Sequence, residues 1–172
     1  MIFVNSMSDL FHENAPEDAV VQIWKKIMEK ASWHTFQVLT KRPERMCKLI
    51  DELRLKTLPN LWLGTSIENK DVLHRIDALK NIAAYIKFIS FEPLIGPVTT
   101  VDLRLVDWVI VGGESGPQAR PMHPEWARTL RDQCTAAGVP FFFKQWGGRT
   151  PKAGGRILDG EIHDEMPQRS AS

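Results

Sequence analysis

The chain has 172 residues, 43% of them hydrophobic and 25% charged, with 22 basic and 21 acidic side chains. This length and composition are typical of one globular domain that can bury a sizeable core. No apolar run approaches the roughly 18 residues that a membrane span needs, and the near-neutral charge creates no broad field for nucleic acid. The first residues lack the pattern of a signal peptide. We therefore expect a soluble, cytoplasmic protein that does not bind membranes.

Short apolar runs alternate with helical patterns along the chain. The runs predict strands at residues 2–4, 35–39, 61–63, 85–89, 108–111 and 141–143. Hydrophobic positions at helical spacing, with proline or asparagine at the start, predict helices over residues 16–31, 43–53, 69–79 and 124–137. Gly138 is the expected C-cap of the last helix. The chain is therefore a series of strand–helix units.

These units predict an α/β fold with a parallel sheet. The strands are continuous apolar runs, which indicates burial on both faces. Nearly every strand is followed by polar residues, which favours a (βα) barrel over a doubly wound sheet, where functional residues gather at one switch point. We predict a partial (βα) barrel of about six units over residues 1–148. The Asp159-Gly160 pair predicts a β-hairpin in a C-terminal extension over residues 149–167. Residues 168–172 are expected to form a flexible tail.

Polar side chains follow the predicted strands, and parallel pairing would bring them to one rim. Carboxylates, lysines and an arginine in one concave site would suit a polar, charged ligand. Three of these residues, Asp9, Arg42 and Glu68, have the alternative role of capping helices or forming structural pairs. The inventory is Asn5, Ser8, Asp9, Lys41, Arg42, Thr65, Ser66, Glu68, Glu92, Glu114, Lys144, Gln145 and Trp146.

Two strand ends carry more specific expectations. The Gly112-Gly113-Glu114-Ser115-Gly116 run lets the backbone approach a ligand, although tight turns with positive φ would also explain its glycines. Lys144 follows three phenylalanines, which would suit an amine nucleophile or base. We favour an ion pair for it instead, with Glu114 as the partner. Trp146 is expected to stack on a planar ligand.

Six segments together resemble a known family. They read FVNSMSDLFH (3–12), QVLTKRP (37–43), LWLGTSIE (61–68), SFEPL (90–94), VGGESG (111–116) and FKQWG (143–147). The chain resembles the phage and prophage family labelled gp thirty-seven/gp sixty-eight, or three-Cys-motif, a divergent branch of the radical S-adenosylmethionine superfamily. The resemblance implies a partial (βα) barrel, an iron–sulfur cluster on three N-terminal cysteines, S-adenosylmethionine as cofactor and a three-Cys-motif partner protein.

The cysteine-rich segment of that family has no counterpart here. Cys47 and Cys134 lie on helical patterns and do not replace three closely spaced thiolates. Since 172 residues are well below the ~250 of a full barrel, we expect a truncated chain without the cluster loop and without a metal site. No cofactor is therefore expected in this chain.

The expected site residues fall into three groups. The catalytic candidates are Glu92, Glu114 and Lys144. In the intact family form, the cofactor would contact Thr65, Ser66, Glu68, Gly112 and Gly113. The substrate, expected to be a nucleotide or nucleic-acid group, would contact Asn5, Ser8, Asp9, Lys41, Arg42, Gln145 and Trp146.

Three functions remain open from the sequence. The first is the substrate side of a radical-S-adenosylmethionine-like protein. The second is a metal-independent barrel enzyme in which Lys144 or Lys41 performs acid–base or Schiff-base chemistry with Glu92 and Glu114. The third is a non-catalytic binding or assembly protein with the hairpin as its interaction arm.

Overall fold

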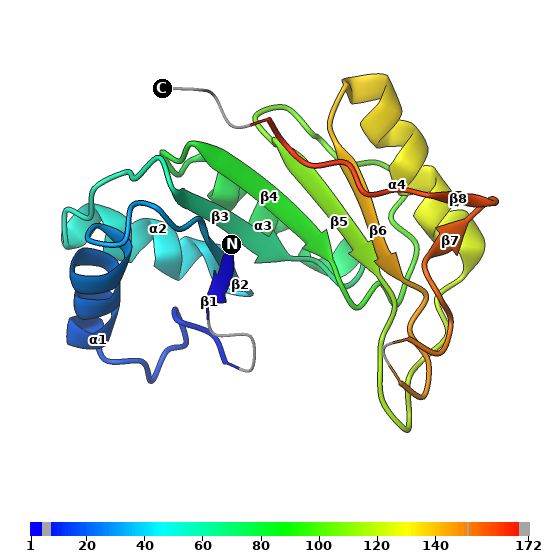
Figure 1. Ribbon diagram of the computed structural model, residues 1–172, viewed down its shortest axis with the longest axis horizontal. Helices are drawn as coiled ribbons and strands as arrows, with labels where there is room; N and C mark the ends of the chain where they lie inside the picture. Colours follow the sequence, from blue (N-terminus) through cyan, green and yellow to red (C-terminus); the bar gives the residue numbers. More distant parts are fainter. Residues whose placement is uncertain (5–7, 151, 169–172) are drawn as a thin grey trace. The chain divides into compact units, whose positions relative to one another are not determined.

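The computed structural model of the protein describes residues 1–4, 8–150 and 152–168, with the backbone alone at residues 26 and 27. Six strands make up one sheet in the order β1-β2-β3-β4-β5-β6, and β7 and β8 pair separately (Figure 1). The strands are β1 (Ile2–Val4), β2 (Phe36–Thr40), β3 (Leu61–Ser66), β4 (Ile86–Phe91), β5 (Trp108–Gly112), β6 (Phe141–Gln145), β7 (Ile157–Leu158) and β8 (Glu161–Ile162). The helices are α1 (Glu17–Gln22), η1 (Ile23–Met28), α2 (Pro43–Glu52), η2 (Lys70–Val72), α3 (His74–Lys80) and α4 (Pro124–Ala137).

Strand order confirms the partial (βα) barrel topology. Strands β1 to β3 pair in parallel, as do β4 to β6. A doubly wound sheet would place its first strand inside the sheet and reverse direction beside it. Here each strand lies beside the strand that precedes it in the chain, which is the order of a (βα) barrel. None of the described helices is long and apolar enough to cross a bilayer.

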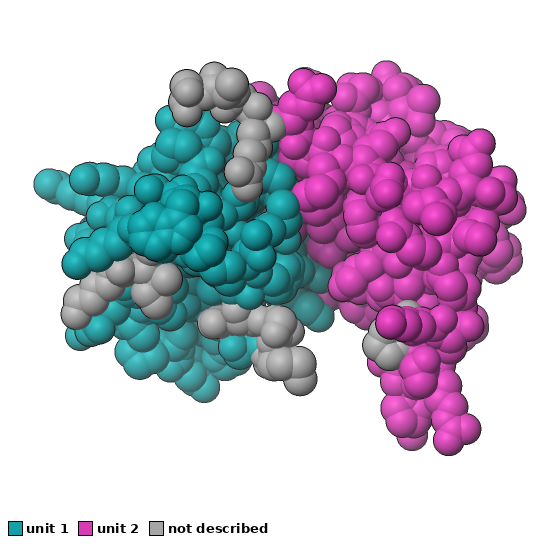
Figure 2. All heavy atoms as spheres, in the orientation of Figure 1, with its two compact units in different colours: residues 1–66, 74–87 teal, residues 67–73, 88–172 magenta. Residues whose placement is uncertain are grey.

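The chain divides into two compact units, which are coloured separately in Figure 2. Unit 1 comprises residues 1–66 and 74–87, and unit 2 comprises residues 67–73 and 88–172. In unit 1, α3 packs on β3 and α2 packs on α3. The largest buried side chains of unit 1 include Trp24, Met28, Met46, Leu61, Leu63 and Leu79. Trp24 and Met28 lie on η1, Met46 on α2 and Leu79 on α3. Leu61 and Leu63 lie on one face of β3 and the buried Trp62 lies on the other, as a continuous apolar run predicts.

Unit 2 has its own aromatic core. Phe88, Trp108 and Phe142 form a chain of ring contacts with centroids 5.9 and 5.8 Å apart. Both α4 and β7 contact β6. The end of the described chain covers β6, because Phe143 donates its N–H to the His163 carbonyl at 2.9 Å. Unit 2 therefore protects its last strand with the segment that follows the hairpin.

Two predicted helices differ in detail from the structure. The helix expected over 16–31 is an α-helix to Gln22 and then the π-helix η1, where Glu29 N–H donates to the Trp24 carbonyl. The Trp24 indole N–H reaches the Lys56 carbonyl at 2.9 Å, so a tertiary contact accompanies this change of helix. The helix expected from Asn69 begins as the 3₁₀ turn η2, capped by the Asn69 side chain, before α3 starts at His74.

The predicted hairpin is confirmed and is attached to α4 by charge. Asp159 and Gly160 have φ values of 55° and 86°, as a two-residue turn of this kind needs. The Asp159 carboxylate accepts hydrogen bonds from Arg128 at 2.7 Å and from Arg131 at 2.6 Å. These two guanidinium groups lower the pKa of Asp159 to about 2. The tail expected from 168 onward lies outside the described residues beyond Gln168.

This ion pair predicts a specific acid sensitivity. Because the pKa of Asp159 is about 2 in the folded protein and 3.8 ordinarily, its contribution is complete above about pH 4 and disappears as the pH falls through 2. We expect Asp159→Asn, which keeps the left-handed turn, to lower the melting temperature at pH 6 and to lower it much less at pH 2. Thermal unfolding followed by circular dichroism measures this. An equal deficit at both pH values would contradict the assignment.

Candidate functional site

In unit 2, three neighbouring strands end in polar residues at one edge. Parallel pairing aligns Phe91 of β4 with Val111 of β5, and Val111 with Phe143 of β6. Glu92 follows the first of these residues, while Lys144 and Gln145 follow the last and close β6. The carboxyl ends of parallel strands are the usual place for functional side chains in (βα) barrels. This edge is therefore the candidate site of unit 2.

Glu92, Lys144 and Gln145 form a polar cluster at this edge, which we call the Glu92 cluster, and the Glu92 carboxylate is its centre. It accepts a hydrogen bond from the Gln145 amide at 2.8 Å and lies 2.9 Å from the Lys144 ammonium. Gln145 also donates to the Gly113 carbonyl, at 3.3 Å. A Cβ atom on Gly112 would lie 3.2 Å from the Glu92 carboxyl group, so glycine leaves room for these contacts. One carboxylate at the end of β4 thus positions two donors at the end of β6, across the intervening strand β5.

The predicted partner of Lys144 was wrong. Lys144 pairs with Glu92, because the β5–β6 register shifts between Val111 and Gly112 and brings Gly112 opposite Gln145. The expected desolvation of Lys144 is also absent, since 51% of its side chain is exposed. A nucleophilic lysine is typically activated by desolvation or by a neighbouring cation. The observed environment supplies solvent and a carboxylate instead.

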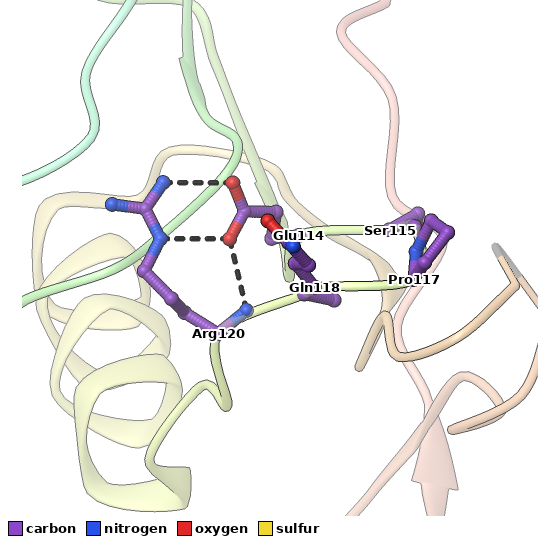
Figure 3. A pocket seen from close by; sticks show the side chains of 7 residues that line it. Glu114, Ser115, Pro117, Gln118 and Arg120 are labelled. Atoms are coloured by element: carbon purple, nitrogen blue, oxygen red, sulfur yellow. Dashed lines mark hydrogen bonds and ion pairs between the residues drawn. The ribbon is translucent and has the colours of Figure 1, made fainter.

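Glu114 pairs with Arg120, a residue that the sequence interpretation overlooked. Both guanidinium contacts are 2.7 Å long, and the Arg120 backbone N–H donates to the same carboxylate at 2.9 Å (Figure 3). The Arg120 hydrogen bonds lower the pKa of Glu114 to about 2. Glu114 therefore remains ionised at neutral pH and has no proton to donate as a general acid. The pair closes the 114–120 loop, which lines an open cavity of about 650 Å³.

The glycines after β5 pack against the loop after β6. We define the β5 loop as residues 113–116 and the β6 loop as 146–148, which run side by side beyond their strands (Figure 1). Gly113 N–H donates to the Gln145 carbonyl at 2.9 Å, and Gly148 N–H donates to the Glu114 carbonyl at 2.8 Å. A Cβ on Gly113 would overlap the Trp146 carbonyl oxygen. Gly112 and Gly113 do not need positive φ, whereas Gly116 does, at 136°.

Trp146 is engaged within unit 2. Its ring lies edge-on to Phe143 with centroids 4.8 Å apart, and its indole N–H donates to the Ile157 carbonyl at 2.8 Å. Its backbone N–H donates to Gly155 at 2.9 Å. These contacts connect the β6 loop to the start of the hairpin and account for the indole without a planar ligand.

A second cavity, of about 450 Å³, opens beside the Glu92 cluster. We call it the Arg156 cavity, and its lining is Lys144, Gln145, Lys152, Gly155 and Arg156. The Arg156 guanidinium lies over the Phe142 ring, with 5.3 Å from its carbon to the ring centroid. Its Nε and Nη2 atoms are buried and have no hydrogen-bond partner among the described residues. Among the described residues, the lining contains three cationic side chains and no carboxylate, and much of its surface is apolar.

Unit 1 has a separate polar cluster around Asp9. One carboxylate oxygen accepts from the Thr40 hydroxyl at 2.7 Å, and the other accepts from Lys41 N–H and from Arg42, both at 3.1 Å. The Thr65 hydroxyl donates to the Thr40 carbonyl at 3.0 Å. Asp9 and Arg42 thus pair with each other, which gives both the structural role that the sequence left open as an alternative to ligand binding.

The remaining expected site residues have varied surroundings. Ser8 is exposed, and Asn5 lies outside the described residues. Ser66 is buried, and its carbonyl accepts from Arg75 at 2.9 Å. Glu68 is half-buried in unit 2, and its carbonyl accepts from Ile95 N–H at 2.9 Å. The polar strand ends of unit 1 are joined by contacts within that unit.

The ligand set of an iron–sulfur cluster is not found in the described part of the chain. There, no three His, Cys, Asp or Glu side chains gather in a way that could hold a metal ion. Cys47 is half-buried on α2 in unit 1, and Cys134 is buried on α4 in unit 2. Burial raises the pKa of the Cys134 thiol to about 12, and the two cysteines lie on different helices. The residues described do not fit a three-thiolate cluster.

Sequence reasoning missed the arginines of unit 2 because they lie outside strand ends. Arg120 is in the loop that leads to α4, and Arg156 follows Gly154 and Gly155 just before β7. Nothing in their spacing separates them from ordinary surface cations. An arginine between a glycine pair and an apolar strand is the one signal that Arg156 carried.

Comparison with known proteins identifies a family and no further relative. The chain matches, over residues 1–167, the family described as Protein of unknown function (DUF5131). No curated protein and no solved structure has significant similarity to it.

The close loop contact predicts that Gly113 tolerates no side chain. We expect Gly113→Ala to lower the free energy of unfolding by more than 2 kcal/mol, roughly the cost of overpacking a tight contact, because the new methyl overlaps a backbone oxygen. Gly155→Ala is the control: its φ is 69° and its Cβ would meet open space, so we expect only about 1 kcal/mol. Urea unfolding measures both. Equal losses would contradict the loop packing.

The reassigned ion pair predicts which carboxylate is coupled to Lys144. In double-mutant cycles, Lys144→Ala with Glu92→Gln should show a coupling of about 0.5 kcal/mol, as partly exposed pairs do. Lys144→Ala with Glu114→Gln should show none. Coupling to Glu114 alone would restore the pairing expected from the sequence. Urea unfolding of the single and double variants provides the measurement.

Proposed function

The chain belongs to the family described as Protein of unknown function (DUF5131), and we propose that it is a (βα) domain that binds a small polar ligand. The ligand would lie at the carboxyl ends of β4 to β6, beside the Glu92 cluster and in the Arg156 cavity. The observation that carries this proposal is the Glu92 carboxylate holding both Lys144 and Gln145 at the border of a cavity of about 450 Å³. Small-molecule sites typically have this size and a few convergent polar groups.

The cluster is suited to positioning a ligand. Lys144 keeps exposed N–H donors at the cavity, since 51% of its side chain is accessible while Glu92 holds it in place. Gln145 is fixed by two acceptors, Glu92 and the Gly113 carbonyl. These two acceptors use both N–H groups of Gln145, so its side chain offers a ligand only the carbonyl oxygen. The available donor is Lys144, and a donor with restricted motion loses less conformational entropy when a ligand binds. Glu114, the other catalytic candidate, is engaged with Arg120 and closes its own loop.

Acid–base or Schiff-base chemistry receives less support from these contacts. The Glu114–Arg120 pair leaves Glu114 ionised, and Lys144 lies in solvent beside a carboxylate. We therefore favour binding over the metal-independent enzyme of the sequence-based alternatives. The Asp-Gly hairpin as an interaction arm also receives less support, because Asp159 is bound to α4.

The family resemblance contributes further parts to the proposal. S-adenosylmethionine enters as a candidate ligand, with its carboxylate facing the cations of the Arg156 cavity. Its sulfonium and amino groups are positive, which makes it a poorer electrostatic match to this cavity than a neutral or anionic nucleoside derivative. The resemblance to the gp thirty-seven/gp sixty-eight family adds a phage or prophage setting and a three-Cys-motif partner protein.

Nuclear magnetic resonance titration tests the proposal. The probes are S-adenosylmethionine, adenosine and ADP. They share an adenosine-like part and differ in the group at the 5′ position, which is cationic, neutral and anionic, respectively. We expect at least one to shift the Gln145 side-chain amide in a saturable way. Glu92→Gln should weaken that binding at least tenfold, about 1.4 kcal/mol or one hydrogen bond to a charged group.

Glu161→Gln provides the matched control, because Glu161 is exposed on β8 and does not line the Arg156 cavity. This variant should bind like the unmodified protein. The proposal fails if none of the three probes shifts the Gln145 amide, or if both glutamate variants lose affinity equally. Thermal unfolding of each variant separates a loss of binding from a loss of fold.

A further inference from the structure

From the composition of the Arg156 cavity we infer that its ligand carries a phosphate group, held by Arg156 and Lys152 with Lys144 beside them. This inference rests on the proposed function and adds the chemical class of the ligand. Among the described lining residues, Lys144, Lys152 and Arg156 are cations, and the others are Gln145 and Gly155. Glu92 offsets one positive charge through its contact with Lys144. The remaining charge calls for an anion in the cavity.

Arg156 differs from the arginines of unit 2 that form ion pairs. Arg104, Arg120, Arg128 and Arg131 each donate to at least one carboxylate, at distances of 2.9 Å or less. Arg156 has no such carboxylate among the described residues, and its Nε and Nη2 atoms are both buried and unpartnered. Burying charged donors without acceptors is costly. An acceptor that enters from the cavity would remove this cost once the atoms that cover these two nitrogens move aside.

The surroundings of Arg156 hold its guanidinium ready for such an acceptor. Phe142 lies under it, 5.3 Å from the guanidinium carbon to the ring centroid, and supplies an attraction that uses no hydrogen-bond donor. The backbone before it is fixed, because Trp146 N–H donates to the Gly155 carbonyl at 2.9 Å. A Cβ on Gly155 would meet open space. The space beside Gly155, next to the arginine, is therefore open.

Phosphate satisfies this arrangement better than a carboxylate. A phosphate monoester carries a charge of roughly −1.5 to −2 at neutral pH and three strong acceptor oxygens. Arg156 offers neighbouring N–H donors in a planar fork that fits two of these oxygens. Lys152 is exposed on the turn before Arg156 and supplies a mobile point charge. The volume of about 450 Å³ fits a small phosphorylated molecule, such as a mononucleotide.

Isothermal titration calorimetry with inorganic pyrophosphate tests the inference. We expect saturable binding at low ionic strength, weakened about tenfold by Arg156→Gln and by Lys152→Gln. Arg156→Lys keeps the charge but loses the planar fork, so it should weaken binding less than Arg156→Gln. The charge-matched control is Arg149→Gln, because Arg149 is exposed nearby and does not line the cavity. It should change the affinity less than twofold.

AMP and adenosine test whether the phosphate group itself contributes to binding. They also separate failure of this inference from failure of the proposed function. AMP should bind at least tenfold more tightly than adenosine, from which it differs by the phosphate alone. If AMP and adenosine bind equally and still shift Gln145, the inference fails while the proposed function survives. If neither they nor pyrophosphate bind, the inference fails, and the proposed function fails with it only if S-adenosylmethionine and ADP also leave the Gln145 amide unshifted.

A single-stranded oligonucleotide is the remaining arm. The oligonucleotide could bind tightly and be weakened equally by Arg149→Gln and Arg156→Gln. That result would assign the cations to a nucleic-acid surface and overturn the small-molecule inference. Lys152 is exposed, so Lys152→Gln should fold normally even if Arg156→Gln is destabilised. An unchanged pyrophosphate affinity in folded Lys152→Gln would also overturn the inference.

Discussion

The loops after β5 and β6 continue the parallel pairing of their strands, and the candidate site of unit 2 depends on this backbone contact. Gly113 and Gly147 allow it, because a Cβ on either would overlap a backbone oxygen of the opposite loop. The contact holds Gln145 beside Gly112, where the missing side chain leaves space for Glu92. The glycines that suggested a ligand loop thus serve first to bring two strand ends together.

Charge pairing then separates the structural groups from those that remain available. Asp159 and Glu114 are engaged with arginines, which lowers the pKa of both carboxyl groups to about 2. They fix the hairpin and the 114–120 loop. Lys144 and Gln145 are positioned by Glu92 yet border a cavity, and Arg156 has buried donors without acceptors. The groups of unit 2 that remain available for binding are therefore the donors around the Arg156 cavity. The carboxylates with the lowest pKa values, Asp159 and Glu114, stabilise the fold.

Much of the fold could be predicted because local patterns and the parallel arrangement agree. Apolar runs marked all six strands of the sheet, and Asp159-Gly160 marked the hairpin. The predictions failed where a distant contact intervenes. The π-helix η1 accompanies the Trp24–Lys56 contact, and the pairing of Lys144 depends on a register shift at Gly112. Strand lengths also differed, since β3 and β6 continue through polar residues that had been expected after them.

The sequence by itself determined the α/β class, the order of the elements and the gathering of polar residues at strand ends, because periodicity and turn chemistry act over a few residues. For Asp9 and Arg42 it offered a structural role beside ligand binding and named no partner, and the structure pairs the two. The tertiary structure alone decided which carboxylate meets which cation. Glu92 and Lys144 lie 52 positions apart, and their distance follows from strand register. Arg156 stands out only after folding, because a lack of acceptors is a property of its surroundings in space.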